Sequence, residues 1–268
     1  MGRAANGTMP PVNDDTATRK DTIQAFVDRS KRVRTVGIRR SFLQAGRGAQ
    51  SGAGVLSWFV RRKDDLALDL YLLLLLRGRG ARYGGHYVDV QSGTWTRVLG
   101  REGDSSNQVL SRALRRLEDH HLIKRIKTRK GMRTELLKED GSGRAYSPPT
   151  GGPKELYFQL PLNYWLQDHY VTLSTPGKAM LLIALGEQPE FELQAARVPS
   201  FYGISSETAI RGFDELVKAG LARFDLRSVK DAMAPLGHRT VKFWRLLPPY
   251  EREEPVVAHG VTRLRRVK

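Results

Sequence analysis

One pattern of helix cap, apolar stripe and following strand occurs twice in this chain. The first copy, SSNQVLSRALRRLEDHHLIKR, begins at Ser105, and the second, SSETAIRGFDELVKAGLARFD, begins at Ser205. In both, serines that can cap a helix precede apolar residues at helical spacing. At one constant offset, Ser106, Arg112, Leu114, Leu117, Leu122 and Lys124 coincide with Ser205, Arg211, Phe213, Leu216, Leu221 and Arg223. These matches predict one structural unit that is used twice.

The residues around the first copy complete a small unit. The run LALDLYLLLLL, Leu66 to Leu76, is too short to span a bilayer and carries Asp69 inside it, so it predicts a buried helix. The stretch HYVDVQ then predicts a strand, and SGTWTRVLG predicts a short helix. After the helix of the first copy, two strands are predicted over residues 123–129 and 133–138, joined by a turn at Lys130 and Gly131.

The residues around the second copy predict the same order. LSTPGKAMLLIALG, residues 173–186, has a Ser/Thr cap, a proline in the first turn and then a buried helix. A second helix is predicted within residues 191–202 and a third over 205–219, with Gly220 as its C-terminal cap. Hairpin strands are predicted over 221–229 and 240–246.

The order of helix, strand, helix, helix and hairpin is similar to that of winged-helix proteins. The phrases LALDLYLLLL, EDGSGRAYSPP, YFQLPLNYWL, LSTPGKAMLLIAL and YGISSETAIRGFDELVKAGL resemble actinobacterial proteins with paired winged helices, over about Leu66 to Tyr250. This resemblance implies a helix-turn-helix DNA-binding fold and brings no catalytic residues. The architecture is also similar to that of plasmid replication initiators.

We therefore expect an α+β fold, mainly α, with two winged-helix (helix-turn-helix) domains in tandem. Residues 1–63 are expected to be a basic N-terminal leader, largely disordered or a linker. Residues 64–161 are expected to form the first, DNA-binding domain and residues 162–249 the second. Residues 250–268 are expected to be a basic C-terminal tail.

The charge of the chain favours a polyanionic partner. The formal net charge is +17, the pI is about 10.4, and residues 1–151 carry most of the excess. Nucleic acid is the commonest such partner, because neutralised phosphates release counterions and drive binding. The alternative is a solubilising basic surface. The basic segment Lys31 to Arg40 is a further candidate for phosphate contact.

The first copy supplies the candidate DNA-binding side chains. With the leucines turned inward, the early turns of the helix should expose polar and basic residues that can bond base edges. These candidates for base readout are Asn107, Gln108, Ser111, Arg112 and Arg115. The candidates for phosphate contact on the strands and the wing are Lys124, Lys127, Arg129, Lys130 and Arg133. The alternative is a solvated amphipathic helix with ordinary surface charge.

The second copy has lost most of its positive charge. Its third helix should expose Glu207, Asp214 and Glu215, and carboxylates repel phosphate. Arg211, Arg223 and Arg239 are therefore predicted to contact DNA only secondarily. We expect this unit to pack against the first unit, to form a homodimer contact or to bind a protein partner. Its aromatic residues are expected in the core rather than as a base-stacking platform.

No catalytic or metal-binding pattern stands out. Cysteine is absent, the six histidines are scattered, and the pair His120-His121 is interpreted as a helix cap. We expect no enzyme activity, no cofactor, no metal and no membrane association, and we expect a cytoplasmic, nucleoid-associated protein. The expected function is sequence-specific binding of double-stranded DNA in transcriptional regulation. Two alternatives are a replication initiator of a plasmid or mobile element, and a protein-interaction module that uses the second winged helix.

Overall fold

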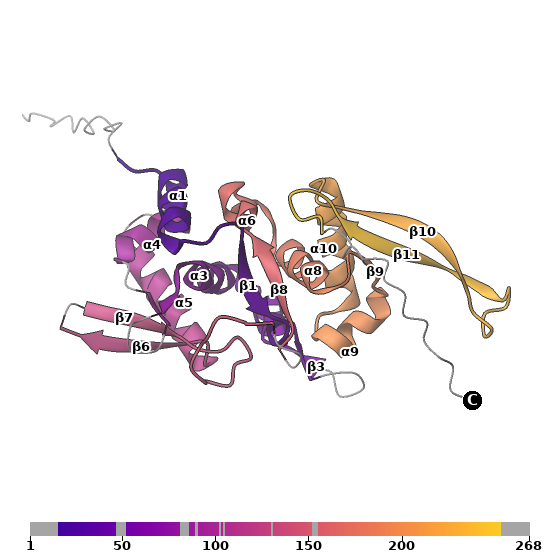
Figure 1. The fold of residues 1–268 in the computed structure, drawn as a ribbon, viewed down its shortest axis with the longest axis horizontal. Coiled ribbons are helices and arrows are strands. Elements are labelled where there is room, and N and C mark those ends of the chain that lie inside the picture. Colours follow the sequence, from indigo (N-terminus) through magenta and orange to yellow (C-terminus); the bar gives the residue numbers. More distant parts are fainter. Residues whose placement is uncertain are drawn as a thin grey trace, which may run out of the picture.

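The computed structural model describes residues 16–46, 52–80, 86–88, 91–101, 103, 105–129, 131–151 and 155–252. The fold is mixed α+β, with 45% helix and 24% strand, which confirms the expected class. Two units lie at opposite ends of the long axis, and each carries a β-hairpin that points away from the centre (Figure 1). The apolar helices α3 (Asp65–Arg77) and α8 (Thr175–Gly186), one from each unit, lie toward the centre, together with a small two-stranded sheet.

The first unit spans residues 65–136 and has the element order expected from the sequence. Its elements are α3 (Asp65–Arg77), β4 (Arg79–Gly80), β5 (His86–Val88), α4 (Ser92–Val98), α5 (Ser106–Asp119), β6 (Ile123–Thr128) and β7 (Gly131–Leu136). The sheet has the strand order β4-β5-β7-β6, and each neighbouring pair is antiparallel. The strand between the first two helices therefore pairs with the second strand of the hairpin.

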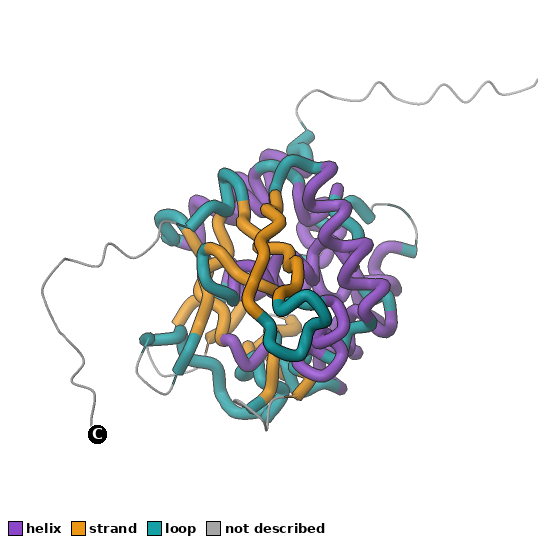
Figure 2. Tube along the Cα trace, turned by 90° about the vertical axis from the view of Figure 1, so that its right-hand side faces the viewer, coloured by secondary structure: helices purple, strands orange, loops and turns teal. Residues whose placement is uncertain are grey.

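The second unit spans residues 175–246 and repeats this order. Its elements are α8 (Thr175–Gly186), β9 (Glu190–Glu192), η3 (Ala195–Arg197), α9 (Val198–Tyr202), α10 (Ser206–Lys218), β10 (Ala222–Lys230) and β11 (His238–Leu246). The strand order β10-β11-β9 matches β6-β7-β5. Figure 2 views the molecule from the end that carries this hairpin. The second helix, expected within residues 191–202, is α9 and occupies only the end of that range. Phe191 pairs with Trp244 in the sheet, and α9 begins at Val198 with Pro199 in its first turn.

The ends of α5 and α10 show how closely the two units correspond. His121 and Gly220 both have left-handed backbone conformations, with φ of 54° and 69°. In each case the next residue turns back, so that Leu122 donates to the carbonyl of Leu117 and Leu221 to that of Leu216. In both copies, therefore, the third helix ends at a left-handed residue and the chain then continues directly into a strand.

The N-terminal segment differs from its prediction. Most of the described part of residues 1–63, expected as a disordered leader or linker, is folded into α1 (Arg19–Ser30), β1 (Thr35–Arg39), η1 (Arg40–Phe42), β2 (Gln44–Ala45), β3 (Gly52–Ala53) and α2 (Leu56–Arg62). Helix α1 packs on α3 and α4 and buries Ile23, Phe26 and Val27. The apolar face of this helix supplies the burial that offsets the entropy of ordering the segment.

The basic residues of this segment are largely engaged inside the fold. Arg32 donates to the carbonyls of Leu75 and Leu76 at the end of α3. Arg39 is 5% exposed. Arg40 forms an ion pair with Glu187 at 2.9 Å. The segment from Lys31 to Arg40 is therefore not the free phosphate-binding stretch that its composition indicates.

Arg39 anchors the N-terminal strand through a buried network. Its guanidinium lies 2.7 Å from Glu139, whose side chain is fully buried, and 2.6 Å from Glu155. A further bond runs from the guanidinium to Ser147, and the Arg39 backbone N–H donates to Glu139. Strand β1 is thereby tied to the loop that follows the first hairpin and to β8 (Tyr157–Pro161), with which it pairs antiparallel.

The two units share one hydrophobic core. Between them, α6 (Asn163–Leu166) and α7 (His169–Thr172) follow β8 and contribute buried aromatic residues to this core. Helix α9 packs against β3, and Gly203 at its end has φ of 64°, where a Cβ atom would lie 2.5 Å from that of Ala53. The boundary expected near residue 161 therefore does not separate two independent cores.

Candidate nucleic-acid interface

Helix α5 presents its polar face to solvent. Leu110, Ala113 and Leu117 are buried against the unit, and Leu114 packs on them partly buried. All five candidates for base readout are exposed: Asn107, Gln108, Ser111, Arg112 and Arg115. Their arrangement follows from the helical period, and their role in base readout stays a prediction.

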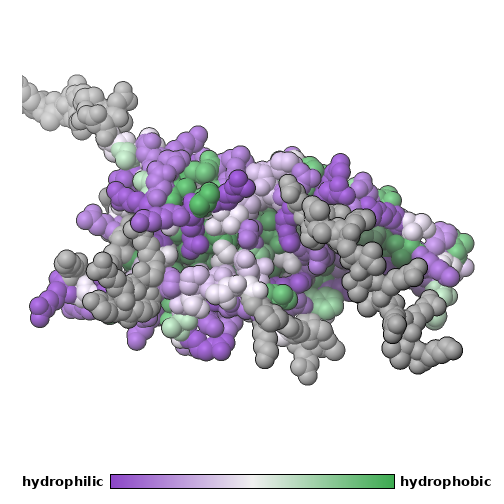
Figure 3. Space-filling view, viewed as in Figure 1, coloured by the Kyte–Doolittle hydropathy of each residue, from purple (hydrophilic) through white to green (hydrophobic). Residues whose placement is uncertain are grey.

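The hairpin β6–β7 carries the second group of candidates. Lys124, Lys127 and Arg129 are exposed. Arg133 is half-buried and places its guanidinium 5.2 Å from the centre of the Tyr87 ring, so it is held against the sheet. Lys130 lies outside the described residues. The side chains of this end of the molecule form a hydrophilic surface at the hairpin tip (Figure 3).

The cations of the first unit divide into two groups. Arg116 forms an ion pair with Asp64, and Arg125 lies 2.8 Å from Glu118. Burial would raise the pKa of Glu118, but hydrogen bonds from the backbone and guanidinium of Arg125 outweigh it and lower that pKa. By contrast, none of the following forms an ion pair within the described part of the chain: Arg112, Arg115, Lys124, Lys127 and Arg129.

An open groove runs between helices α4 and α5 and the first hairpin. It has a volume of about 1070 Å³. Asn107 and Ser111 line it from α5, and Arg125, Arg129 and Met132 line it from the hairpin. Amide, hydroxyl and guanidinium groups therefore meet in one concave surface, where they can bond bases or phosphates.

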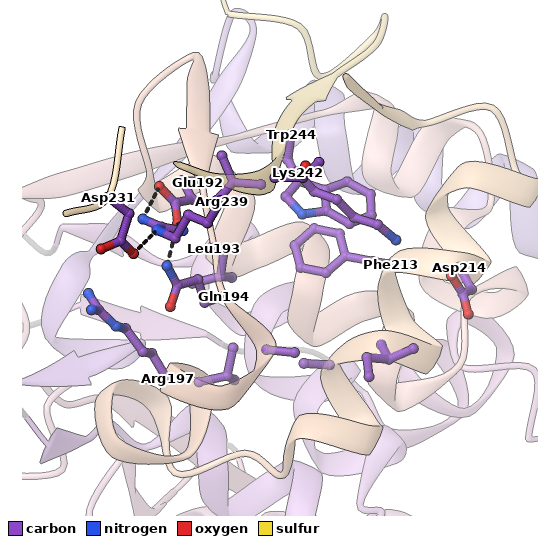
Figure 4. A pocket seen from close by; sticks show the side chains of 16 residues that line it. Glu192, Leu193, Gln194, Arg197, Phe213, Asp214, Asp231, Arg239, Lys242 and Trp244 are labelled. Atoms are coloured by element: carbon purple, nitrogen blue, oxygen red, sulfur yellow. Dashed lines mark hydrogen bonds and ion pairs between the residues drawn. The ribbon is translucent and has the colours of Figure 1, made fainter. Parts of the chain in front are cut away.

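The second unit has a groove in the corresponding place with different chemistry. This groove, of about 560 Å³, lies between α10 and the second hairpin (Figure 4). At the offset that relates the two copies, Ile210 stands where the first unit has Ser111, and Asp214 where it has Arg115. Ile210 is 51% exposed at the groove, over the buried rings of Phe213 and Trp244. At these two positions the second unit has an apolar side chain and a carboxylate where the first has a hydroxyl and a guanidinium, although Arg197, Arg239 and Lys242 also line the second groove.

Tyr202, Phe213 and Trp244 of the second unit are buried in the core, as expected, whereas Phe201 and Phe243 are half-buried and Phe224 is 37% exposed. The rings of Phe213 and Trp244 stack with centroids 4.1 Å apart, and each residue is 5% exposed. Their faces are turned to each other. A base could not stack between them without separating them.

Most arginines of the second hairpin are neutralised by β9. Arg239 lies 2.8 Å from Glu192 and 3.5 Å from Asp231, as Figure 4 shows. Hydrogen bonds from Arg239 and Gln194 lower the pKa of Glu192 and keep it ionised. Arg227 and Arg245 both pair with Glu190.

The three secondary candidates of this unit therefore differ from one another. Arg239 is engaged by the carboxylates of Glu192 and Asp231, so its guanidinium is less able to bind a phosphate. Arg211 is exposed and lies 3.9 Å from Glu207, a long contact at the surface. Arg223 is exposed and forms no ion pair in the part of the chain that the structure describes. The acidic partners in β9 were missed in the sequence, because a three-residue strand gives no usable periodic signal.

The remaining sequence expectations concern metals, histidines and membranes. The described residues contain no group of three or more His, Asp or Glu side chains placed to hold a metal ion. The His120 ring packs on Trp58, with centroids 3.7 Å apart, and burial lowers its pKa. In the described ranges no helix has the length and apolarity needed to cross a bilayer.

Comparison with family models, with curated proteins and with solved structures returned no match.

Proposed function

We propose that this protein binds double-stranded DNA in a sequence-specific manner, through α5 and the β6–β7 hairpin. The proposal takes both units as winged helices in tandem. It is supported by the shared order of helix, strand, helix, helix and hairpin, and by the shared strand order of their sheets. In that fold the third helix enters the major groove and the hairpin lies along the backbone or the minor groove.

The observation that carries the proposal is the set of unpaired cations on one end of the molecule. Arg116 and Arg125 are engaged by carboxylates, whereas five other basic residues of α5 and the hairpin form no ion pair among the described residues, although the charge of Arg115 acts on Glu118. Free cations beside Asn107 and Ser111 fit phosphate contact next to base readout.

Salt dependence of binding tests the proposal. The full chain is titrated against fluorescent duplex DNA at several salt concentrations, first with random sequence and then with fragments selected from a random pool. We expect the logarithm of affinity to fall linearly with the logarithm of salt concentration, with a slope of about −0.9 for each phosphate contacted. Binding that does not change with salt, or selection that enriches no sequence, would contradict it.

The biological role that we propose is transcriptional regulation, with replication initiation as the alternative. A map of bound sites across the genome separates the two. Sites at many promoters support a regulator, whereas one cluster of repeated sites beside the gene for this protein supports an initiator.

The second unit supports a different role from the first. Its groove has an apolar surface at Ile210, and Glu190 and Glu192 neutralise three arginines of its hairpin. The hairpin also exposes apolar side chains at its far end, where Met233 is 93% and Leu236 80% exposed. Figure 3 shows apolar residues at this end of the molecule. We propose that this unit binds a protein and contacts DNA only secondarily.

A further inference from the structure

One edge of the small central sheet has no partner strand. The sheet contains only β1 and β8 among the described residues. The N–H of Arg40 donates to the carbonyl of Leu156, and the N–H of Leu162 donates to that of Arg34, both at 2.9 Å. Because bonded pairs alternate along an antiparallel ladder, the N–H and C=O groups of Tyr157 and Gln159 point to the opposite edge.

That outer edge of β8 is open. Within the described residues nothing accepts a hydrogen bond from the backbone N–H of Tyr157 or of Gln159. A groove of about 850 Å³ adjoins the strand, and its lining includes Tyr157, Gln159 and Pro161, residues 33–35 where β1 begins, and residues 249–252. Two apolar side chains in its lining are left in solvent, Val33 at 87% and Leu166 at 41% exposure.

Only some of the features with which proteins protect an edge occur in this strand, which is five residues long and ends in a proline. Its sequence, YFQLP, has no charged residue, and its register with β1 is continuous without a bulge. Its proline, Pro161, stands at the last position, where the missing N–H removes a donor but the carbonyl remains an acceptor. The edge can therefore accept a further strand along its length.

We propose that β8 pairs with β8 of a second copy of this chain, antiparallel and centred on Gln159. In this register Gln159 lies opposite Gln159 of the partner subunit, and the two exchange both backbone hydrogen bonds. The N–H of Tyr157 donates to the carbonyl of Pro161 of the partner subunit. Pro161 has no N–H of its own, but its carbonyl can still accept this bond. Without that N–H, the carbonyl of Tyr157 receives no hydrogen bond in this register. The strand is uncharged, so pairing with a second copy places no like charges opposite each other.

This dimer is independent of the proposed DNA binding. It forms at the centre of the chain, whereas α5 and the first hairpin lie at one end (Figure 1). Its two-fold axis would place two copies of the candidate nucleic-acid interface on one assembly. A symmetric site of two half-sites is the expected DNA target if both proposals hold.

The test uses the central position of Gln159, whose side chain is exposed on the solvent face of the strand. Sedimentation equilibrium of the full chain should show a dimer. Gln159→Lys and Gln159→Glu each place like charges opposite each other and should weaken dimerisation roughly fivefold. An equimolar mixture of the two variants should restore it as a heterodimer. Gln159→Thr, which keeps the donor and adds no charge, is the matched control.

A second variant removes the hydrogen bonds themselves. Gln159→Pro deletes the central donor from both copies but leaves the bonds from β8 to β1, and it should weaken dimerisation on the order of tenfold. Circular dichroism checks that each variant is folded, and the charge variants decide the matter if the proline variant is not. A monomeric wild-type chain, or a mixture of the Lys and Glu variants that associates no better than either alone, would overturn the proposal.

Discussion

Lys178 donates hydrogen bonds to both carboxylate oxygens of Asp69, at 2.7 and 2.9 Å, from a site where 2% of its side chain is exposed. Lys178 comes from the second unit and Asp69 from the first, so this contact joins the two buried helices at the centre of the molecule. Burial raises the pKa of Asp69 to about 7, against the opposing charge of Lys178. Neither residue is accommodated in the core without the other.

Breaking this pair should destabilise the whole chain. Lys178→Met leaves the Asp69 carboxyl buried without its partner, and we expect the free energy of unfolding in urea to fall by about 3–5 kcal/mol. The double variant Asp69→Leu with Lys178→Met removes both charges, and it should recover most of that loss. A double variant as unstable as the single one would show that packing, and not the unpaired carboxyl, sets the cost.

Arg39 should be as important to the N-terminal segment. Arg39→Met leaves Glu139 buried and unpaired, and a loss of about 3–5 kcal/mol in the free energy of unfolding is expected. Arg34→Met is the matched control, since Arg34 is exposed and forms no ion pair in the described ranges. Its effect should stay within about 0.5 kcal/mol. Equal effects of the two variants would argue that the segment does not depend on the buried pair.

The loss of folding stability at acidic pH should depend on Glu155. Hydrogen bonds from Thr150 and Arg39 lower its pKa to about 2. A carboxyl whose pKa is lower in the folded chain than in the unfolded chain stabilises the fold at neutral pH. That stabilisation is lost as the pH falls from about 4.5 toward 2.

The corresponding measurement compares unfolding midpoints across that pH range. Glu155→Gln should lower stability at neutral pH and reduce the drop on acidification. Glu251→Gln is the control, because Glu251 is exposed and unpaired among the described residues. If the two variants give parallel curves, other carboxyls account for the loss of stability at acidic pH.

Charge reversal separates the roles of the two third helices. Arg112→Glu should weaken DNA binding at least about tenfold, because it removes a candidate base contact and adds repulsion beside phosphate. Arg211→Glu changes the matching position of the second unit, and it should have a much smaller effect. Anisotropy titrations at one fixed salt concentration compare them. Equal losses would mean that both units meet DNA alike.

Local patterns explain which parts of the fold were predictable. The caps and leucine spacing of α5 and α10 lie within a few turns of chain, so both helices and the hairpins after them were predicted correctly. The exposure of the α5 candidates follows from the same helical period. The left-handed cap at Gly220 was also predicted, because glycine adopts that conformation without strain.

The remaining features depend on partners far away in the sequence. Arg39 reads as a solvent-facing cation until Glu139, 100 residues later, is placed beside it. In the same way Arg239 reads as a phosphate contact until β9 brings Glu192 to within 2.8 Å. The sequence shows that a residue is charged but does not show which distant residue will pair with it. For this reason the prediction for the N-terminal segment was wrong.

The pairing of β1 with β8 also fixes the order in which the chain can assemble during synthesis. Arg39 and Glu155 are 116 residues apart, which a ribosome covers in roughly 6–23 s. Throughout that interval the early strand, with its buried valine and isoleucine, must wait without its neighbour while the first hairpin is completed. Until β8 has been synthesised, the side chains of Val36 and Ile38 therefore lack the neighbouring strand that helps to bury them, and slower synthesis lengthens that interval.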